Sequence, residues 1–279
     1  MTFHASPLSN KDLAKQKTKT RKKEKTVKPG EESPASRENI GAKKGLADFE
    51  LTGKVFVVTG GGQGLGLALA EALVEAGGKV YYVDRTPEPD EAWQQAQERV
   101  VPEWGGSLHY RQHDYFKQDA PDHEEQLDRL IQSITEENGH LDGLSAARQM
   151  LTHNTRGTIV LVAHLSSLVA NKGLLSAVPN SPRAALVQLA RDLATRWSPI
   201  NPDGSGGIRV NCISPDNILT PVLEAQFVKD PGLKEYCEKD NMMGRLADNS
   251  EFKGAVLFLS SKASSFMTGG NRLVDGGKL

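Results

Sequence analysis

Cysteine and long apolar segments are scarce in this chain of 279 residues. Its two cysteines, Cys212 and Cys237, are too few for a disulfide framework, and no apolar secretory stretch lies near residue 1, so we expect a reducing compartment. The longest apolar candidate, residues 158–170, contains a histidine and two serines and falls short of the ~18 residues that span a bilayer. The sequence therefore argues against a disulfide-built secreted scaffold and against a membrane protein.

Neither sign of charge is in excess overall, since 34 Lys and Arg stand against 35 Asp and Glu. The distribution is uneven, because residues 1–46 hold 12 basic and 5 acidic groups and residues 47–279 hold 22 and 30. The acidic body lacks the positive footprint of a nucleic-acid-binding domain, so nucleic acid is an unlikely partner. We expect a cytoplasmic protein, with a nuclear location through the basic run at residues 11–28 as the alternative.

Two regions of different composition follow one another along the chain. Residues 1–46 are predicted to form a disordered basic arm, because residues 11–28 contain nine Lys or Arg and the stretch shows no apolar periodicity. Residues 47–279 alternate β-branched runs with amphipathic patterns, which is typical of βαβ units. With 38% hydrophobic residues overall, the prediction is one α/β domain with a doubly wound parallel sheet.

Hydrophobic periodicity places the elements of this domain. Strands are predicted at residues 55–58, 79–84, 141–144, 158–162, 208–213 and 272–274. Helices are predicted at residues 65–76, 126–134, 146–152, 184–197 and 252–259. The helix over 184–197 would carry one apolar stripe made of Leu186, Leu189, Leu193 and Trp197.

Glycine is concentrated between the first strand and the first helix, in the run from Thr59 to Gly66, TGGGQGLG. Such a turn lets the backbone approach a pyrophosphate held at a helix N-terminus, although a plain strand-to-helix turn also favours glycine. Asp84 ends the next strand 18 residues after Gly66, where a carboxylate accepts hydrogen bonds from ribose hydroxyls. The pair predicts a dinucleotide site that favours NAD, while Arg85 could neutralise a 2′-phosphate and keeps NADP open.

With three further segments, Arg209-Val210-Asn211, Thr268-Gly269 and Val274-Asp275-Gly276-Gly277, this loop resembles the short-chain dehydrogenases/reductases over about residues 51–277. Residues 207–215 and 241–246 look most like the fungal polyol and sugar reductases of the mannitol, arabinitol and sorbose type. The resemblance implies a single Rossmann-type domain and a homo-oligomer. It also implies NAD(P)-dependent interconversion of a secondary alcohol and a ketone, with a small polyol or ketose as substrate.

The resemblance also implies roles for single residues. The pyrophosphate would be contacted by four residues of the loop, Gly60, Gln63, Gly64 and Leu65. Asp84 would bind the adenosine ribose, Asp114 the adenine and Thr220 the nicotinamide carboxamide. Asp114 is equally explained as a loop carboxylate, and Thr220, followed by a proline, as a helix cap. No metal site is expected.

The catalytic positions depart from the family pattern. Ser166 matches the serine that binds the substrate oxygen, but the tyrosine position holds Pro179 and the lysine position holds Arg183. Proline has no ionisable group, so the general acid is absent. Arg183 could bind ribose hydroxyls, but its pKa above ~12 excludes proton transfer. His164 would share a strand face with Ser166 and is a conceivable substitute acid; the alternative is a half-buried histidine without a catalytic role.

The connection from residue 145 to residue 157 is short for a crossover between parallel strands. The family has an Asn-Asn-Ala-Gly turn and a long helix here, so the sequence predicts that the central crossover helix has been deleted. Asp216 replaces a family glycine and adds negative charge beside the nicotinamide. Three hypotheses follow: an enzyme with a rebuilt site, an inactive or truncated relative with doubtful oligomerisation, and a nuclear partner acting through the basic arm.

Overall fold

The computed structural model describes residues 46–60, 64–114, 123–143, 147–170 and 177–279. Nearly all of the basic arm predicted for residues 1–46 therefore lies outside the described residues, and its disorder and its boundary stay predictions. The described residues belong to one unit of the chain, Gly45–Leu279. None of the helices described there is long and apolar enough to cross a membrane.

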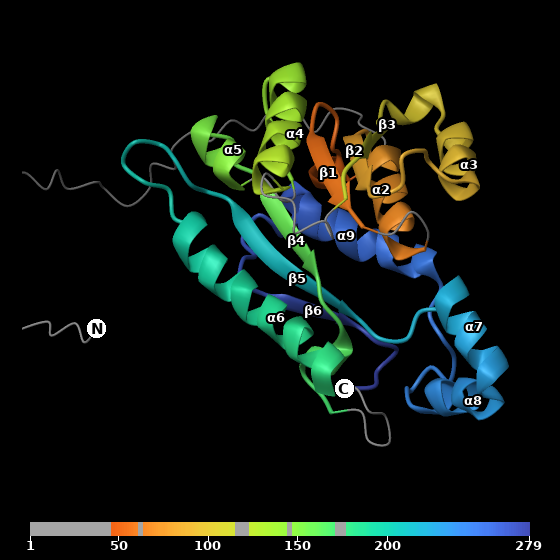
Figure 1. Cartoon of the computed structure of the whole chain (residues 1–279). Helices are drawn as coiled ribbons and strands as arrows, with labels where there is room; N and C mark the ends of the chain where they lie inside the picture. The colour runs from red at the N-terminus through yellow and green to blue at the C-terminus, as the bar shows by residue number, and fades with distance from the viewer. Residues whose placement is uncertain (1–45, 61–63, 115–122, 144–146, 171–176) are drawn as a thin grey trace, which may run out of the picture. The chain divides into compact units, whose positions relative to one another are not determined.

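Six parallel strands of the described residues form two three-stranded sheets, labelled in Figure 1. The first sheet has the order β1-β2-β3, with β1 at Val55–Thr59, β2 at Lys79–Asp84 and β3 at Ser107–Gln112. The second has the order β4-β5-β6, with β4 at Thr158–Val162, β5 at Arg209–Pro215 and β6 at Asn271–Val274. Gly143 joins them, because it pairs in parallel with both Phe56 of β1 and Thr158 of β4.

Helices cover both faces of the strands. The longer ones are α2 (Leu65–Glu75), α3 (Glu91–Arg99), α4 (His123–Asn138), α6 (Ala177–Trp197), α7 (Pro221–Lys229), α8 (Pro231–Lys239) and α9 (Lys253–Ser260). A six-residue helix, α5 (Ala147–Thr152), precedes β4. Single 3-10 turns lie at Ala47–Phe49, Pro102–Trp104, Leu165–Ser167, Asn249–Phe252 and Lys262–Ser264. The arrangement confirms the α/β fold with parallel strands covered on both faces.

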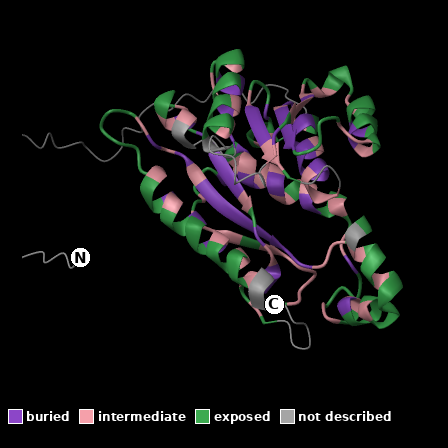
Figure 2. Cartoon of the chain, viewed as in Figure 1, coloured by how far each residue is buried: buried purple, intermediate pink, exposed green. Residues whose placement is uncertain are grey.

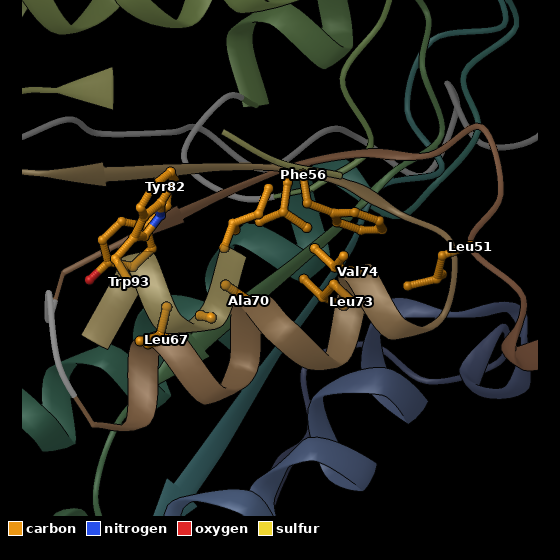
Figure 3. Close-up of a cluster of buried hydrophobic side chains, with 11 residues drawn as sticks. Leu51, Phe56, Leu67, Ala70, Leu73, Val74, Tyr82 and Trp93 are labelled. Atoms are coloured by element: carbon orange, nitrogen blue, oxygen red, sulfur yellow. The ribbon is translucent and has the colours of Figure 1, made fainter. Parts of the chain in front are cut away.

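Alternation along the strands decides which helix each side chain meets. Val55 and Val57 of β1 pack in a cluster with Ile131 and Ile134 of α4, whereas Phe56 packs on the opposite face. Figure 3 shows Phe56 among the side chains of α2, with Tyr82 and Trp93 at the other end of the same cluster. Because both faces are covered, the strands are largely buried in Figure 2 and read as continuous apolar runs.

At the strands, most predicted elements are confirmed within one or two residues, but one strand and three helices were missed and one strand is wrong as drawn. The predicted strand over residues 141–144 pairs in its described part only at Gly143, as an isolated bridge. The missed strand is β3, of which Leu108 alone is fully buried. The missed helices are α3, where burial is limited to Trp93 and Ala96, and the consecutive helices α7 and α8, of which α8 buries Cys237 alone. These elements gave too little apolar signal for a periodicity argument.

The buried face of α6 differs from the predicted stripe. Val187, Ala190 and Ala194 are buried against β4 and β5. Leu189 is 43% exposed, and the other members of the stripe are only partly buried, namely Leu186, Leu193 and Trp197. Small side chains let the helix approach the strands closely, so the larger leucines lie at the edge of the contact. The predicted stripe is therefore partly exposed, at Leu189.

Candidate functional site

The carboxyl ends of all six described strands share one edge, and the residues predicted for the site follow those ends. Gly60 follows β1, and Asp84 is the last residue of β2. Ser166 lies in the 3-10 turn after β4, and Thr220 follows β5. In open parallel sheets ligands bind outside this edge. The fold therefore brings the predicted residues to the edge where a cofactor is expected.

No side chain of the described residues caps the N-terminus of α2, so its first backbone donors are open to a ligand. Its N-cap is Gly64, which has a positive φ of 71° and provides no capping oxygen. By contrast, Asp90 caps α3 by accepting a hydrogen bond from the Trp93 N–H. Gly60 also has a positive φ, 83°, and a Cβ built on it would meet no atom within 4 Å. These open N–H groups fit a pyrophosphate. Gln63, predicted for the same role, lies outside the described residues.

Asp84 is buried, with 8% of its surface exposed, at the end of β2. Its Oδ1 accepts the N–H of Arg85 at 2.7 Å, and its Oδ2 accepts the hydroxyl of Tyr82 at 3.3 Å. Burial and the neighbouring carboxylate raise the pKa of Tyr82, so this phenol stays protonated and donates. Oδ1 of Asp84 also accepts the Thr86 N–H at 3.5 Å. A carboxylate has about four acceptor positions, so Asp84 keeps the capacity to accept about one ribose hydroxyl.

Asp114 follows β3 by two residues and is half-buried. The N–H of the preceding His113 donates to the Asp84 carbonyl oxygen at 2.7 Å. Asp114 thus lies beside Asp84 at the β2–β3 edge, where an adenine is expected. Its role as an adenine contact remains a prediction.

Thr220 lies against the glycine loop although 156 positions separate it from Gly64. A Cβ built on Gly64 would lie 3.7 Å from Thr220 Cγ2 and 3.8 Å from Asn249 Oδ1. Thr220 is also the N-cap of α7, because its hydroxyl oxygen accepts the Leu223 N–H at 3.3 Å. The helix-cap interpretation is confirmed, and the hydroxyl proton remains available to a ligand near the loop.

Ser166 is enclosed by two polar side chains. Its hydroxyl oxygen accepts from Nη1 of Arg183 at 3.1 Å. His164 Nδ1 lies 3.1 Å from the Ser166 backbone nitrogen and 2.9 Å from its Oγ. Because Nδ1 accepts the backbone N–H, it carries no proton, and the Ser166 hydroxyl must donate to it. The serine proton is therefore directed at His164. The two residues meet in a turn after β4 ends, and not along a continued strand.

His164 is neutral near pH 7. Burial, then the positive charges of Arg183 and Lys278, lower the pKa of His164 to about 4. A general acid is most effective when its pKa lies near the working pH. His164 therefore suits the role of a fixed hydrogen-bond acceptor better than that of a substitute acid. Pro179 lies on α6, and its side chain is outside what the structure describes.

A second charged group, built around Lys278, escaped the sequence argument. Lys278 Nζ lies 3.4 Å from Oδ1 of Asp216 and 2.6 Å from Oδ2 of Asp240, and its side chain is only 12% exposed. Burial raises the pKa of Asp216, and its Oδ2 has no hydrogen-bond partner in the described part of the chain. Asp216 was expected from the missing glycine, but no local signal points to Lys278, which lies 62 positions away.

A cavity of about 510 Å³ lies between β1 and β4. Its lining includes Val58 and Thr59 of β1, Val160 and Val162 of β4, and the loop residue Gly60. Because β1 and β4 both pair with Gly143, they lie two strand spacings apart, about 9.5 Å, which is the width that one intervening strand requires. The cavity occupies this space between β1 and β4, and Gly143 is one of its lining residues.

Two family models match the chain. A model described as short chain dehydrogenase matches residues 54–147, and one described as Enoyl-(Acyl carrier protein) reductase matches residues 144–278. The first ends and the second begins at the connection between Gly143 and β4.

Among curated proteins, a short-chain dehydrogenase/reductase of Aspergillus versicolor, notP′, is 32% identical, with 82% of this chain and 88% of the relative covered. The D-arabinitol 2-dehydrogenase [ribulose-forming] of Scheffersomyces stipitis is 28% identical, with 83% and 96% covered. Among solved structures, a short-chain type dehydrogenase/reductase from Mycobacterium marinum has a TM-score of 0.69 at 25% identity, with 83% and 97% covered.

The lengths of these alignments reveal residues that this chain lacks. The Aspergillus alignment runs over 266 positions but covers 82% of 279 residues, about 229, so about 37 positions have no residue in this chain. The Scheffersomyces alignment runs over 277 positions and covers 83%, about 232 residues, which leaves about 45 such positions. Both relatives therefore contain internal residues that have no counterpart here.

Proposed function

This chain belongs to the short-chain dehydrogenase/reductase family, and from that premise we propose that it is an NAD(P)-dependent oxidoreductase for polyol- or sugar-type alcohols and ketones, with a degraded proton-transfer site. The observation that carries the cofactor part is the uncapped N-terminus of α2 beside Asp84. The polyol class is supported by the arabinitol dehydrogenase relative. NAD(P) would supply or accept the hydride.

The residues that would hold the cofactor are divided between the two halves of the chain. The first-turn N–H groups of α2 and the backbone at Gly60 would bind the pyrophosphate. Asp84 would accept hydrogen bonds from the adenosine ribose and disfavour a 2′-phosphate, which supports NAD over NADP. Thr220, close to Gly64, would contact the nicotinamide side.

The proton-transfer part of the site is proposed to be degraded because no described group replaces the family tyrosine. The Ser166 hydroxyl donates to His164 and accepts from Arg183, so its proton is not directed at a substrate oxygen. A positioned general acid contributes ~10²–10⁴ in rate. Asp216 adds a buried negative charge next to β5. Slow turnover, or none, is the expected consequence.

A second candidate is an inactive relative that has lost an internal segment. The cavity between β1 and β4 and the aligned positions that this chain lacks both support it. We propose that the deleted segment contained the strand beside Gly143 and most of a crossover helix, of which α5 is the remaining end. The third hypothesis, a nuclear partner acting through residues 11–28, concerns residues outside the described ones and is not developed.

Calorimetry with the full chain tests the cofactor proposal. We expect NAD to bind, NADP to bind more weakly, and Asp84→Asn to reduce the NAD affinity at least tenfold because the ribose loses a charged acceptor. Asp90→Asn is the matched control, because asparagine also caps α3. Tight NADP binding without NAD binding would refute the assignment of Asp84.

Turnover distinguishes the two candidates. Purified chain is assayed for NAD(P)H formation with arabinitol and mannitol and for its consumption with fructose and sorbose. Slow turnover that requires NAD(P) supports a degraded enzyme, whereas NAD binding without any turnover supports the inactive relative.

A further inference from the structure

The chain around the Ser166 turn is free of acidic residues over an unusually long distance. From Gly143 to Arg191, 49 consecutive residues include no Asp or Glu, while they include five Lys or Arg. The whole chain is balanced in charge, so this stretch, which includes α5, β4, the turn after β4 and most of α6, carries a local excess of positive charge. Positive charge without nearby carboxylates attracts small anions.

Among the described residues of this stretch, Arg183 is the cation that contacts Ser166. It is half-buried on α6 and donates to Ser166, and it makes no ion pair among the described residues. The neighbouring cation, Lys278, differs in this respect, because Asp216 and Asp240 both neutralise it. Within the described part of the Ser166 site, Arg183 therefore keeps an uncompensated charge, and it has four further N–H donors besides the one directed at Ser166.

We propose that Arg183 and Ser166 form a binding site for the carboxylate of a small hydroxy or keto acid. The planar guanidinium matches a carboxylate through two parallel hydrogen bonds, which an uncharged polyol cannot provide. Ser166 holds the guanidinium in place, because its hydroxyl oxygen accepts from Nη1 of Arg183. The inference goes beyond the proposed polyol chemistry, and it requires neither a cofactor nor turnover.

The pKa of His164 should respond to a ligand at this site, although His164 itself does not contact the ligand. The charges of Arg183 and Lys278 help to depress the imidazole pKa, in addition to burial. A carboxylate bound to Arg183 would offset part of that positive field and raise the imidazole pKa. The two cations that face His164 can be separated experimentally, because only Arg183 is free to bind an added anion.

The test is an NMR titration of the His164 ring in the full chain, with acetate and lactate as probes and chloride at matched ionic strength as reference. We expect a saturable change with both carboxylates, and a rise of roughly 0.5–1 unit in the apparent pKa of His164 at saturation. Mannitol should have no effect. An equal response to chloride, or a shift produced by NAD but by neither carboxylate, would overturn the proposal.

Variants on α6 locate the effect. Arg183→Gln should abolish the saturable shift, and Arg183→Lys, which keeps the charge but loses the planar fork, should weaken it at least tenfold. Arg191→Gln on the same helix should leave the response intact, since Arg191 is exposed and contacts Gln188. Equal losses in the Arg183 and Arg191 variants would show a general field effect and refute the site. Failure of hydride transfer would not alter these readings.

Discussion

Ser166, His164 and Arg183 form a hydrogen-bond network, and the protonation of His164 decides which atoms donate and which accept. The neutral Nδ1 of His164 accepts two hydrogen bonds from Ser166, and protonation would place a third positive charge close to Arg183 and Lys278. The same charges thus determine both the pH response of the fold and the ligand that the site can take. Two predictions follow at this scale.

Stability should fall as the pH decreases from about 6.5 to about 4. The pKa of His164 is about 4 in the folded chain, below its usual 6.5, so the unfolded chain binds the proton first within this window. Above pH 6.5 both states are neutral at this residue and it has no effect. His164→Asn, whose Oδ1 can accept the Ser166 N–H, should remove about 2 kcal/mol of this pH dependence, a figure reduced for partial exposure. Urea unfolding at pH 7.5 and 4.5 measures it.

The exposed His153 provides the control for that measurement. His153→Asn should leave the difference between the two pH values unchanged. If the free energy of unfolding changed with pH equally in the wild-type and His164→Asn chains, the lowered pKa of His164 would be contradicted.

Lys278 should be needed to stabilise the carboxylate of Asp216. Lys278→Met leaves this buried carboxylate without its cation and should reduce the free energy of unfolding by about 3 kcal/mol. Adding Asp216→Gly removes the stranded charge and should recover most of the loss. Denaturant unfolding of the two single variants and the double variant at pH 7 measures the coupling. If the changes in unfolding free energy of the two single variants simply added up in the double variant, Lys278 and Asp216 would not interact.

Gly143 is the residue through which two three-stranded elements become one array. It pairs with Phe56 and Thr158, and its carbonyl accepts the Val57 N–H at 3.3 Å. The adjacent Asp142 supports the bridge, because its carboxylate accepts the Val55 N–H and pairs with Lys54. Because the two groups of strands are joined through so few residues, we expect the stability of the fold to depend on the side chain at position 143.

Gly143→Ala should destabilise the fold by roughly 1–3 kcal/mol through overpacking. The added Cβ would lie 2.4 Å from Cδ1 of Phe56 and 3.3 Å from the Thr158 carbonyl oxygen. Phe56→Leu should relieve part of the clash in the double variant. Thermal and urea unfolding provide the measurement.

The matched control is Gly254→Ala in α9, where a Cβ would meet no atom within 4 Å. Alanine is a better helix former than glycine, so this change should be neutral or stabilise by up to about 1 kcal/mol. Equal losses for the two variants would indicate that contact with Phe56 is not the cause.

At the scale of the whole molecule, the two halves of the described chain contact each other on both sides of the cavity between β1 and β4. Leu69 and Ala72 of α2 pack in one cluster with Val160 of β4 and Val256 of α9. Gly64 meets Thr220 at the carboxyl edge, and the cavity separates β1 from β4 between these contacts. Side chains that line the cavity lose the contacts that a strand would provide, so we expect modest stability and a tendency to associate.

Insertion of the matching central segment of an arabinitol dehydrogenase relative after Ser145 should raise the unfolding temperature and sharpen the transition. The reason is that one strand would fill the space between β1 and β4. Calorimetric scans of the chimera and the wild-type chain test this, and an inserted Gly/Ser segment of equal length is the control. An equal rise with the Gly/Ser segment would contradict the role of the strand.

Enzyme assays test the same proposal, that the chain lacks a central segment after Ser145. We expect Pro179→Tyr with Arg183→Lys to leave polyol turnover undetected in the present chain and to restore some turnover in the chimera. Positioning of the reactants contributes ~7–11 kcal/mol, more than the general acid alone. Robust turnover of the double variant without the insertion would show that the short connection is not the main defect.

The sequence by itself determined the local parts of this protein. Runs such as Val55–Val58 and Lys79–Asp84 specify buried strands because adjacent residues carry the signal. The glycine loop and Asp84 likewise indicated a dinucleotide site, since their spacing within one βαβ unit fixes their relation. Membership in the family followed from these motifs.

Tertiary structure alone decided which residues that are distant in the sequence contact one another. The pairing of Lys278 with Asp216, the approach of Thr220 to Gly64 and the single-residue bridge at Gly143 have no local signature. Their partners lie in separate βαβ units, and only the packing of helices on both faces of the strands sets the distances between them. The contact between Arg183 and Ser166 was likewise decided in space, where Arg183 makes no ion pair among the described residues.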